Sequence, residues 1–180
     1  MVSSLARLIV YACPLGPMAE QIAAFYDASR AQFGPNKAHT YPPHITLTGF
    51  FHDEATALPI YTSALTAAWT TAMAQRPDQP VIITELACTE AFHGLLIVSP
   101  WLENLAANFA ARAVSPSRRE TIRLKSQLHL SLAYGFNATE GPALGGMAQA
   151  MVDPTAPVQW ELRLYEQSEV WKMHGLAHGL

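Results

Sequence analysis

Charged side chains are scarce in this sequence of 180 residues, because Asp, Glu, Lys and Arg together make up only 14% of it. The formal net charge is −3, from 11 basic and 14 acidic residues. Proteins that wrap long nucleic acid are usually rich in Lys and Arg, so this balance argues against such a partner. Half of the residues are hydrophobic, which is enough for a sizeable core and argues against a disordered chain.

Cysteine is also rare, and the spacing of Cys13 and Cys88 matches no metal-binding motif. Two cysteines do not make a disulfide framework, so a reducing, cytoplasmic setting is expected. A His-Glu-x-x-His pair, a glycine-rich phosphate loop and a Gly-x-Ser-x-Gly elbow are all missing. We therefore expect no metal, no cofactor and no serine-hydrolase chemistry.

Long apolar runs are missing too. The longest uncharged run, 55–75, is interrupted by Pro59 and by several Thr and Ser residues, which favours an amphipathic helix over a membrane span. Residues 1–7 have no long apolar core behind a basic start, so we expect no signal peptide. The expectation is a monomer in the cytoplasm without a membrane partner.

Two stretches of the sequence share one pattern, His44-Ile45-Thr46-Leu47-Thr48 and His129-Leu130-Ser131-Leu132-Ala133. Successive side chains of a strand point to opposite faces. Each stretch therefore predicts an imidazole and a hydroxyl side by side on the polar face of a strand. An imidazole can give or take a proton near neutral pH, and a hydroxyl can donate to an anionic oxygen. Together the two pairs supply an acid, a base and two anion-binding donors.

A single His-x-Thr or His-x-Ser tripeptide is common by chance, but its repetition in each half of the chain favours a functional pair. The other histidines are expected to be incidental; they are His39, His52, His93, His174 and His178. The pair Arg118-Arg119 is expected in a solvated loop. Arg123 and Lys125 lie closer to the second motif, where they could raise the local positive potential.

Apolar periodicity predicts the secondary structure around the motifs. Helical spacing predicts helices over 18–33, 58–73, 100–109 and 142–151. Alternating or β-branched runs predict strands over 6–11, 44–48, 81–88, 94–98, 128–132, 158–164 and 170–173. One face of each motif strand is polar, so we expect an α+β fold of antiparallel sheets with helices outside, not a doubly wound parallel sheet.

The paired motifs His44-x-Thr46 and His129-x-Ser131 resemble the signature of the two-histidine (2H) phosphoesterase superfamily. Three further features resemble the small stand-alone cyclic nucleotide phosphodiesterase branch of this superfamily. They are Pro43 before the first His, the strand that runs into Ala12-Cys13-Pro14, and the continuation of the second motif into Ala133-Tyr134-Gly135. The resemblance implies one bilobal domain over residues 1–180. In it, two pseudo-symmetric lobes each contribute a sheet and one motif, and the motifs face each other across a central cleft.

The resemblance also implies an activity, the metal-independent hydrolysis of a cyclic phosphodiester to a phosphomonoester. Small substrates of this kind are 2′,3′-cyclic nucleotides and ADP-ribose 1″,2″-cyclic phosphate. From the resemblance we expect His129 to be the base and His44 the acid, although the near symmetry of the two motifs leaves this assignment open in the sequence itself.

Four further residues are expected at the site. Thr46 and Ser131 would hold the phosphate oxygens, and the resemblance places Tyr11 and Tyr134 along the cleft. Tyr134 is an odd number of residues from His129, so it reaches the cleft only if the strand ends or bulges near 133–135. Burial in the core is the alternative for Tyr134.

Three other functions are compatible with the sequence. One is RNA-end processing by a 2′,3′-cyclic phosphodiesterase acting on longer substrates. Another is a nucleotide-binding module without turnover, which is disfavoured because both histidines and both hydroxyls are present. The third is an α+β interaction protein in which the twin motifs are a coincidence.

Overall fold

The computed structural model describes residues 5–178, so residues 1–4 of the stretch examined for a signal peptide lie outside the described residues. Its eight strands are β1 (Leu5–Leu15), β2 (Ile45–Thr46), β3 (Phe51–Glu54), β4 (Ile82–Cys88), β5 (Phe92–Val98), β6 (Leu128–Tyr134), β7 (Gln159–Gln167) and β8 (Trp171–Ala177). They form one sheet in the order β4-β5-β6-β2-β1-β7-β8, with β3 also paired to β1. Every strand pair of this described part is antiparallel.

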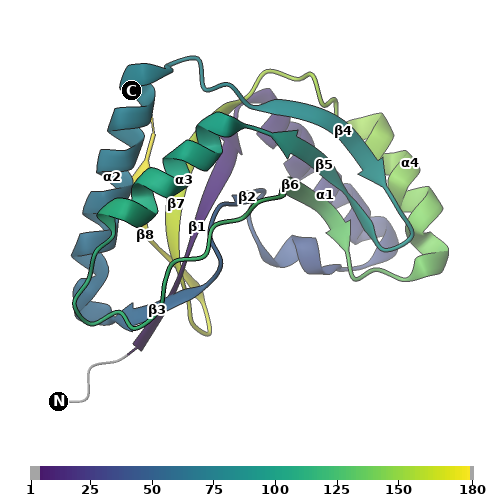
Figure 1. Ribbon diagram of the computed structural model, residues 1–180. Coiled ribbons are helices and arrows are strands. Elements are labelled where there is room, and N and C mark those ends of the chain that lie inside the picture. The colour runs from purple at the N-terminus through teal and green to yellow at the C-terminus, as the bar shows by residue number, and fades with distance from the viewer. Residues whose placement is uncertain (1–4, 179–180) are drawn as a thin grey trace.

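Four helices cover the sheet, α1 (Pro17–Phe33), α2 (Leu58–Gln75), α3 (Pro100–Arg112) and α4 (Gly141–Met151). Helices α2 and α3 pack together over the β7–β8 end, whereas α1 and α4 pack together over β4 and β6 (Figure 1). The predicted α+β fold with helices outside is confirmed. No helix within residues 5–178 is long and apolar enough to cross a membrane.

The two halves of the protein meet at the short strand β2. Its neighbours are β1 on one side and β6 on the other, so the sheet continues from one half into the other and the two motifs lie on adjacent strands. The strand predicted over 44–48 is reduced to Ile45 and Thr46. Beyond them the chain stays attached to β1, because the Leu47 N–H donates to the Val10 carbonyl at 3.0 Å.

Thr48 and the segment after it differ from the sequence-based expectation. Thr48 is fully buried, and its Oγ1 accepts a hydrogen bond from the Val10 N–H at 3.0 Å. It therefore takes the place of a backbone partner for β1. Strand β3, Phe51–Glu54, was not expected, because three of its four residues are polar. It forms because β1 offers a free edge there, with Leu8 opposite Phe51.

Candidate active site

The two histidine motifs are brought together by the pairing of β2 with β6. In this antiparallel pair Ile45 lies opposite Leu130. The register sets His44 beside Ser131 and Thr46 beside His129, because neighbouring side chains of paired strands share a face. All four side chains line one cavity of about 320 Å³. Ile45 and Leu130 are fully buried beneath them, which fixes the polar face of both strands.

A bulge in β6 adds Tyr134 to this cavity. The register between β5 and β6 shifts after His93, so that Ser131 lies opposite Gly94 and Ala133 lies opposite His93. Leu132 and Ala133 are consequently both buried, and the alternation of β6 is reversed by one residue. Tyr134 therefore faces the same side as His129 and lines the cavity. The bulge near residues 133–135 that Tyr134 needs in order to reach the cleft is therefore present.

Gly135 ends the bulged strand with a φ of 68°, a backbone conformation that L side chains rarely adopt. A Cβ atom there would lie 2.9 Å from Cδ of Lys37. The glycine thus lets the turn Lys37–Thr40 pass close to the end of β6. Ala38 of this turn lines the same cavity.

His44 is held by its backbone neighbourhood. Its Nδ1 donates a hydrogen bond to the Pro42 carbonyl oxygen at 2.7 Å. Pro42 precedes a second proline, Pro43, which disfavours a helical backbone at Pro42 and keeps this segment extended. With its proton on Nδ1, the neutral ring of His44 keeps the Nε2 lone pair for another partner.

Burial lowers the pKa of His44 to about 4, and the positive charge that His129 can carry acts in the same direction. The hydrogen bond to Pro42 acts in the opposite direction, but it is the smaller effect. His44 is therefore neutral at pH 7. A neutral imidazole with a free Nε2 can accept a proton, which is the role of a base.

Tyr11 packs against His44. It does not line the cavity of about 320 Å³ but lines a neighbouring cavity that shares His44 and Thr46 with it, so the expectation that Tyr11 lies along the cleft stays a prediction. Its ring stacks on the His44 ring, with centroids 3.8 Å apart and an interplanar angle of 27°. Only 3% of Tyr11 is exposed, because it sits on the central strand β1 opposite Thr46. Strand β1 lies between β2 and β7 in the sheet, which buries Tyr11. Its stacked ring therefore shields one face of the His44 imidazole from water and restricts the orientation of that ring.

His129 has a more open environment than His44. It is exposed, and its Nδ1 lies 3.3 Å from the carbonyl oxygen of Gln127. In both motifs the histidine thus directs Nδ1 at the carbonyl two residues before it. The Phe92 ring meets His129 edge-on, with centroids 5.5 Å apart. An exposed imidazole can exchange its proton with solvent, as an acid must between turnovers.

Sequence reasoning missed several residues that complete the cavity. Tyr26 of α1 donates through its hydroxyl to the Ser131 carbonyl at 2.8 Å and so fixes the second motif from below. Tyr41 meets His44 edge-on, with centroids 5.8 Å apart. Tyr26, Tyr41 and Phe92 all line the cavity. Tyr26 lies in α1, Tyr41 in a loop and Phe92 at the start of β5. These positions carried no signal, because only the folded chain brings them to the motifs.

His39 has a structural role that its position in a loop did not reveal. Its Nδ1 accepts a hydrogen bond from the Asn36 N–H at 3.1 Å, while the Asn36 side chain accepts one from the Ala38 N–H. His39 Nε2 lies 3.0 Å from the Ser29 hydroxyl of α1. This arrangement ties the Lys37–Thr40 turn to α1 and so shapes one wall of the cavity.

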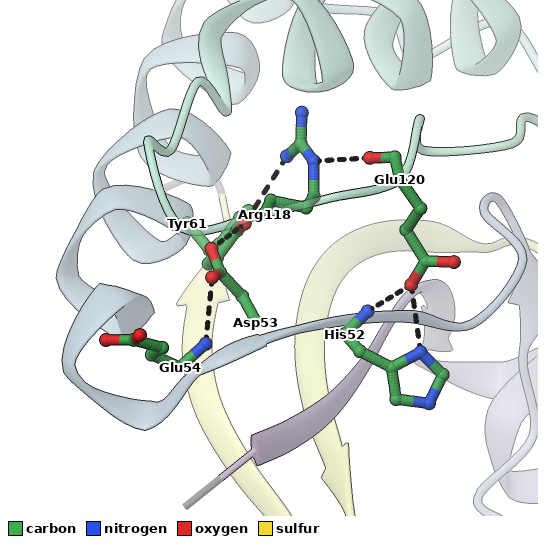
Figure 2. A network of polar contacts seen from close by, with 6 residues as sticks. All are labelled: His52, Asp53, Glu54, Tyr61, Arg118 and Glu120. Carbon is green, nitrogen blue, oxygen red and sulfur yellow. Dashed lines mark hydrogen bonds and ion pairs between the residues drawn. The ribbon is translucent and has the colours of Figure 1, made fainter. Parts of the chain in front are cut away.

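The segment between α3 and β6, expected to be a solvated loop, is anchored to β3. The buried Asp53 accepts hydrogen bonds from Tyr61 at 2.5 Å and Ser117 at 2.6 Å. The Arg118 guanidinium contacts the Tyr61 hydroxyl at 3.3 Å and donates to the Glu120 carbonyl (Figure 2). Burial alone would raise the pKa of Asp53, but its hydrogen bonds outweigh burial and lower it. Arg118 is therefore a structural residue.

Two further His residues are tied to carboxylates. His52 contacts Glu120 through its backbone N–H at 2.6 Å and its Nδ1 at 2.8 Å (Figure 2). His174 lies 2.6 Å from Glu166 on the neighbouring strand. Within residues 5–178, no three His, Cys, Asp or Glu side chains are grouped so that they could hold a metal ion.

The chain is similar to segments of larger animal proteins. It is 32% identical over 162 residues to "Ubiquitin-associated and SH3 domain-containing protein B" of mouse and human, a match that covers 88% of this chain. It is 30% identical over 172 residues to "Ecdysteroid-phosphate phosphatase" of Bombyx mori, covering 92% of this chain. No family model matches the sequence. The chain spans about a quarter of the length of these curated relatives.

Proposed function

We propose that this chain is a two-histidine phosphoesterase that hydrolyses a small cyclic phosphodiester to a phosphomonoester. The observation that carries the proposal is the pairing of β2 with β6, which sets two imidazoles and two hydroxyls around one cavity. The relatives named as phosphatases support chemistry on phosphate esters. That name belongs to proteins about four times as long, so the motifs carry the argument for this chain.

In the proposed reaction, His44 Nε2 takes a proton from a water molecule as the water oxygen attacks phosphorus. The bond between phosphorus and one ring oxygen breaks, and His129 donates its proton to the departing alkoxide. The product is an acyclic phosphomonoester, and solvent returns the proton from His44 to His129. This inventory needs no metal, because acid, base and hydrogen-bond donors are supplied by the chain.

This assignment reverses the sequence-based expectation, in which His129 was the base and His44 the acid. The burial of His44, its Nδ1 bond to Pro42 and its pKa of about 4 all favour the neutral ring. The acid must carry a proton, which suits the more exposed His129. The two motifs are alike in sequence, so only their surroundings distinguish them.

Thr46 and Ser131 are proposed to donate to the non-bridging phosphate oxygens, since both line the cavity beside the histidines. The cavity holds no Lys, Arg, Asp or Glu. A phosphodiester has a single negative charge at neutral pH, whereas a phosphomonoester has close to two. A hydroxyl-lined cavity whose one positive charge is the proposed imidazolium of His129 therefore fits a singly charged cyclic diester better than a monoester. It also favours release of the more highly charged product.

The proposal is tested by incubating the purified chain with 2′,3′-cyclic AMP in excess EDTA and identifying the product by ³¹P NMR. We expect adenosine 2′- or 3′-monophosphate at a rate that zinc or magnesium does not raise. The same preparation with p-nitrophenyl phosphate should show little turnover. Rapid monoester hydrolysis, or turnover that EDTA abolishes and metal restores, would overturn the proposed reaction.

A further inference from the structure

A second cavity, of about 420 Å³, opens beside the one that holds the motif histidines. Four residues line both cavities, so a ligand bound at His44 can continue into the second one. These are Tyr41, His44, Thr46 and Tyr134. Three basic side chains, Arg7, Arg123 and Lys125, also line the second cavity. We call this second cavity, defined by Arg7, Arg123 and Lys125, the basic arm.

The three cations of the basic arm outnumber its one carboxylate, Glu120. Within residues 5–178, none of them forms an ion pair with a carboxylate, although the charge of Arg123 helps to lower the pKa of Glu120. The carboxylate of the arm, Glu120, is engaged by the backbone N–H and the ring of His52 (Figure 2). The net charge of the chain is −3, so this excess of cations over carboxylates in one cavity does not follow from a generally basic surface.

Backbone hydrogen bonds hold two of the cations beside the first motif. The Gly49 N–H donates to the Arg123 carbonyl at 2.7 Å, and the Lys125 N–H donates to the Leu47 carbonyl at 3.0 Å. Thr48 and Leu124 form a β-bridge between these two contacts. The anchor at Asp53 and Ser117 fixes the same segment further upstream. Arg123 and Lys125 are therefore placed by the fold and not by a mobile loop.

Aromatic rings accompany the charges. The Arg7 guanidinium lies 3.8 Å from the centre of the Phe50 ring, and Phe50 and Tyr41 both line the arm. The Trp171 ring contacts both of these rings, with centroids 6.1 Å and 5.2 Å away. Basic side chains beside aromatic faces are the combination that binds the phosphates and bases of single-stranded nucleotides.

We propose that the basic arm binds a second phosphoryl group of the substrate, one nucleoside away from the cyclic phosphate at His44 and His129. This inference rests on the proposed function and names the substrate class more closely. The second phosphate is either a terminal 5′-phosphate or an internucleotide phosphate, since both present anionic oxygens to the arm. Three cations match one or two phosphates, so longer strands gain little more.

The test compares kcat/KM for three substrates, namely 2′,3′-cyclic AMP, its 5′-phosphorylated form, and the dinucleotide ApA with a 2′,3′-cyclic end. Because charge-assisted hydrogen bonds are stronger than neutral ones, a second phosphate should raise kcat/KM about 10- to 100-fold. Comparing the 5′-phosphorylated substrate with the dinucleotide shows whether the basic arm prefers a terminal 5′-phosphate or an internucleotide phosphate. If neither extended substrate exceeds 2′,3′-cyclic AMP, the basic arm is not a phosphate site.

The double variant R123Q/K125Q should lower the ratio of extended to short substrate about 10-fold or more. R119Q is the matched control, because Arg119 is exposed on the same segment and does not line the arm; it should leave the ratio unchanged. The proposal would be overturned if R123Q/K125Q and R119Q lowered this ratio equally, or if neither variant lowered it.

A binding measurement separates this inference from the proposed function. By calorimetry, adenosine 3′,5′-bisphosphate should bind the chain at least 10-fold more tightly than adenosine 3′-monophosphate, and R123Q/K125Q should remove the difference. Tighter binding without any turnover would uphold the basic arm and overturn the phosphodiesterase. Turnover of 2′,3′-cyclic AMP with equal binding of the two nucleotides would uphold the phosphodiesterase and overturn the basic arm as a phosphate site.

Discussion

The ring of Tyr11 lies against the ring of His44, with centroids 3.8 Å apart. Tyr11 belongs to the central strand β1, whereas His44 immediately precedes β2, so the contact joins the motif to the most buried strand of the sheet. The same contact keeps water from one face of the imidazole. Burial is the main cause of the lowered pKa of His44, so Tyr11 is a positioning residue for the proposed base.

The first prediction concerns the pH dependence of this base. In the wild type, kcat/KM should rise with pH around pH 4, where His44 loses its proton, and should fall again at higher pH as the acid is deprotonated. The limbs are macroscopic values of an interacting pair. Y11L removes the stacked ring and should move the rising limb toward about 6.5, the ordinary value for histidine.

Y11F is the matched control, because it keeps the stacked ring and removes only the hydroxyl. Its pH profile of kcat/KM should superimpose on that of the wild type. A wild-type limb that already lies near neutral pH, or a Y11L limb that does not move, would contradict the role of burial at His44.

The second prediction concerns stability. The folded-state pKa of His44, about 4, lies below its value in the unfolded chain, so between these values the unfolded state binds more protons. Unfolding free energy therefore falls as pH is lowered from about 6.5 to 4. From pH 7 to pH 4, urea unfolding should show a loss about 1–3 kcal/mol larger in the wild type than in H44Q. Equal losses would mean that His44 is not protonated on unfolding.

The third prediction concerns the anchor of the 113–127 segment. D53A leaves the Tyr61 hydroxyl, the Ser117 hydroxyl and the Glu54 N–H without their acceptor. Loss of a buried charged partner costs about 2–5 kcal/mol of unfolding free energy. D27A is the control, since Asp27 is exposed in a 3.7 Å pair with Arg30, and should change it by less than about 1 kcal/mol. Similar urea midpoints for both variants would contradict this role of Asp53.

The fourth prediction concerns the wall formed by Tyr134. Stacking of a base on an aromatic ring is worth about 1–3 kcal/mol, so Y134A should raise KM for 2′,3′-cyclic AMP about 5- to 100-fold with a smaller effect on kcat. Y134F keeps the ring and should stay close to the wild type. If kcat falls while KM is unchanged, Tyr134 acts on the chemical step and not as a binding surface.

Local sequence patterns were sufficient for the motifs and most elements. Alternation placed His44, Thr46, His129 and Ser131 on polar faces, and helical spacing predicted α3. That helix begins after Ser99, whose hydroxyl accepts a hydrogen bond from the Leu102 N–H at 3.1 Å. These features depend on residues that are near each other in the chain. The sequence showed that Tyr134 could reach the cavity only if its strand ended or bulged nearby, but it did not show at which residue the bulge lies.

What could not be predicted depends on contacts distant in sequence. Tyr11 is 33 positions before His44 in the printed sequence, and its burial follows from the flanking strands of β1. Strand β3 forms from a polar stretch only because β1 has an edge to pair. The proposed choice between base and acid depends on desolvation, which a symmetric pair of motifs does not encode.

The proposed roles of His44 as base and His129 as acid are tested by measuring turnover of 2′,3′-cyclic AMP in EDTA by H44A and H129A. Each should lower kcat by about 10²- to 10⁴-fold, whereas H174A, which removes a histidine outside both cavities, should turn over like the wild type. Circular dichroism confirms that each variant is folded. A folded H44A or H129A that hydrolyses the substrate at the wild-type rate would contradict the account.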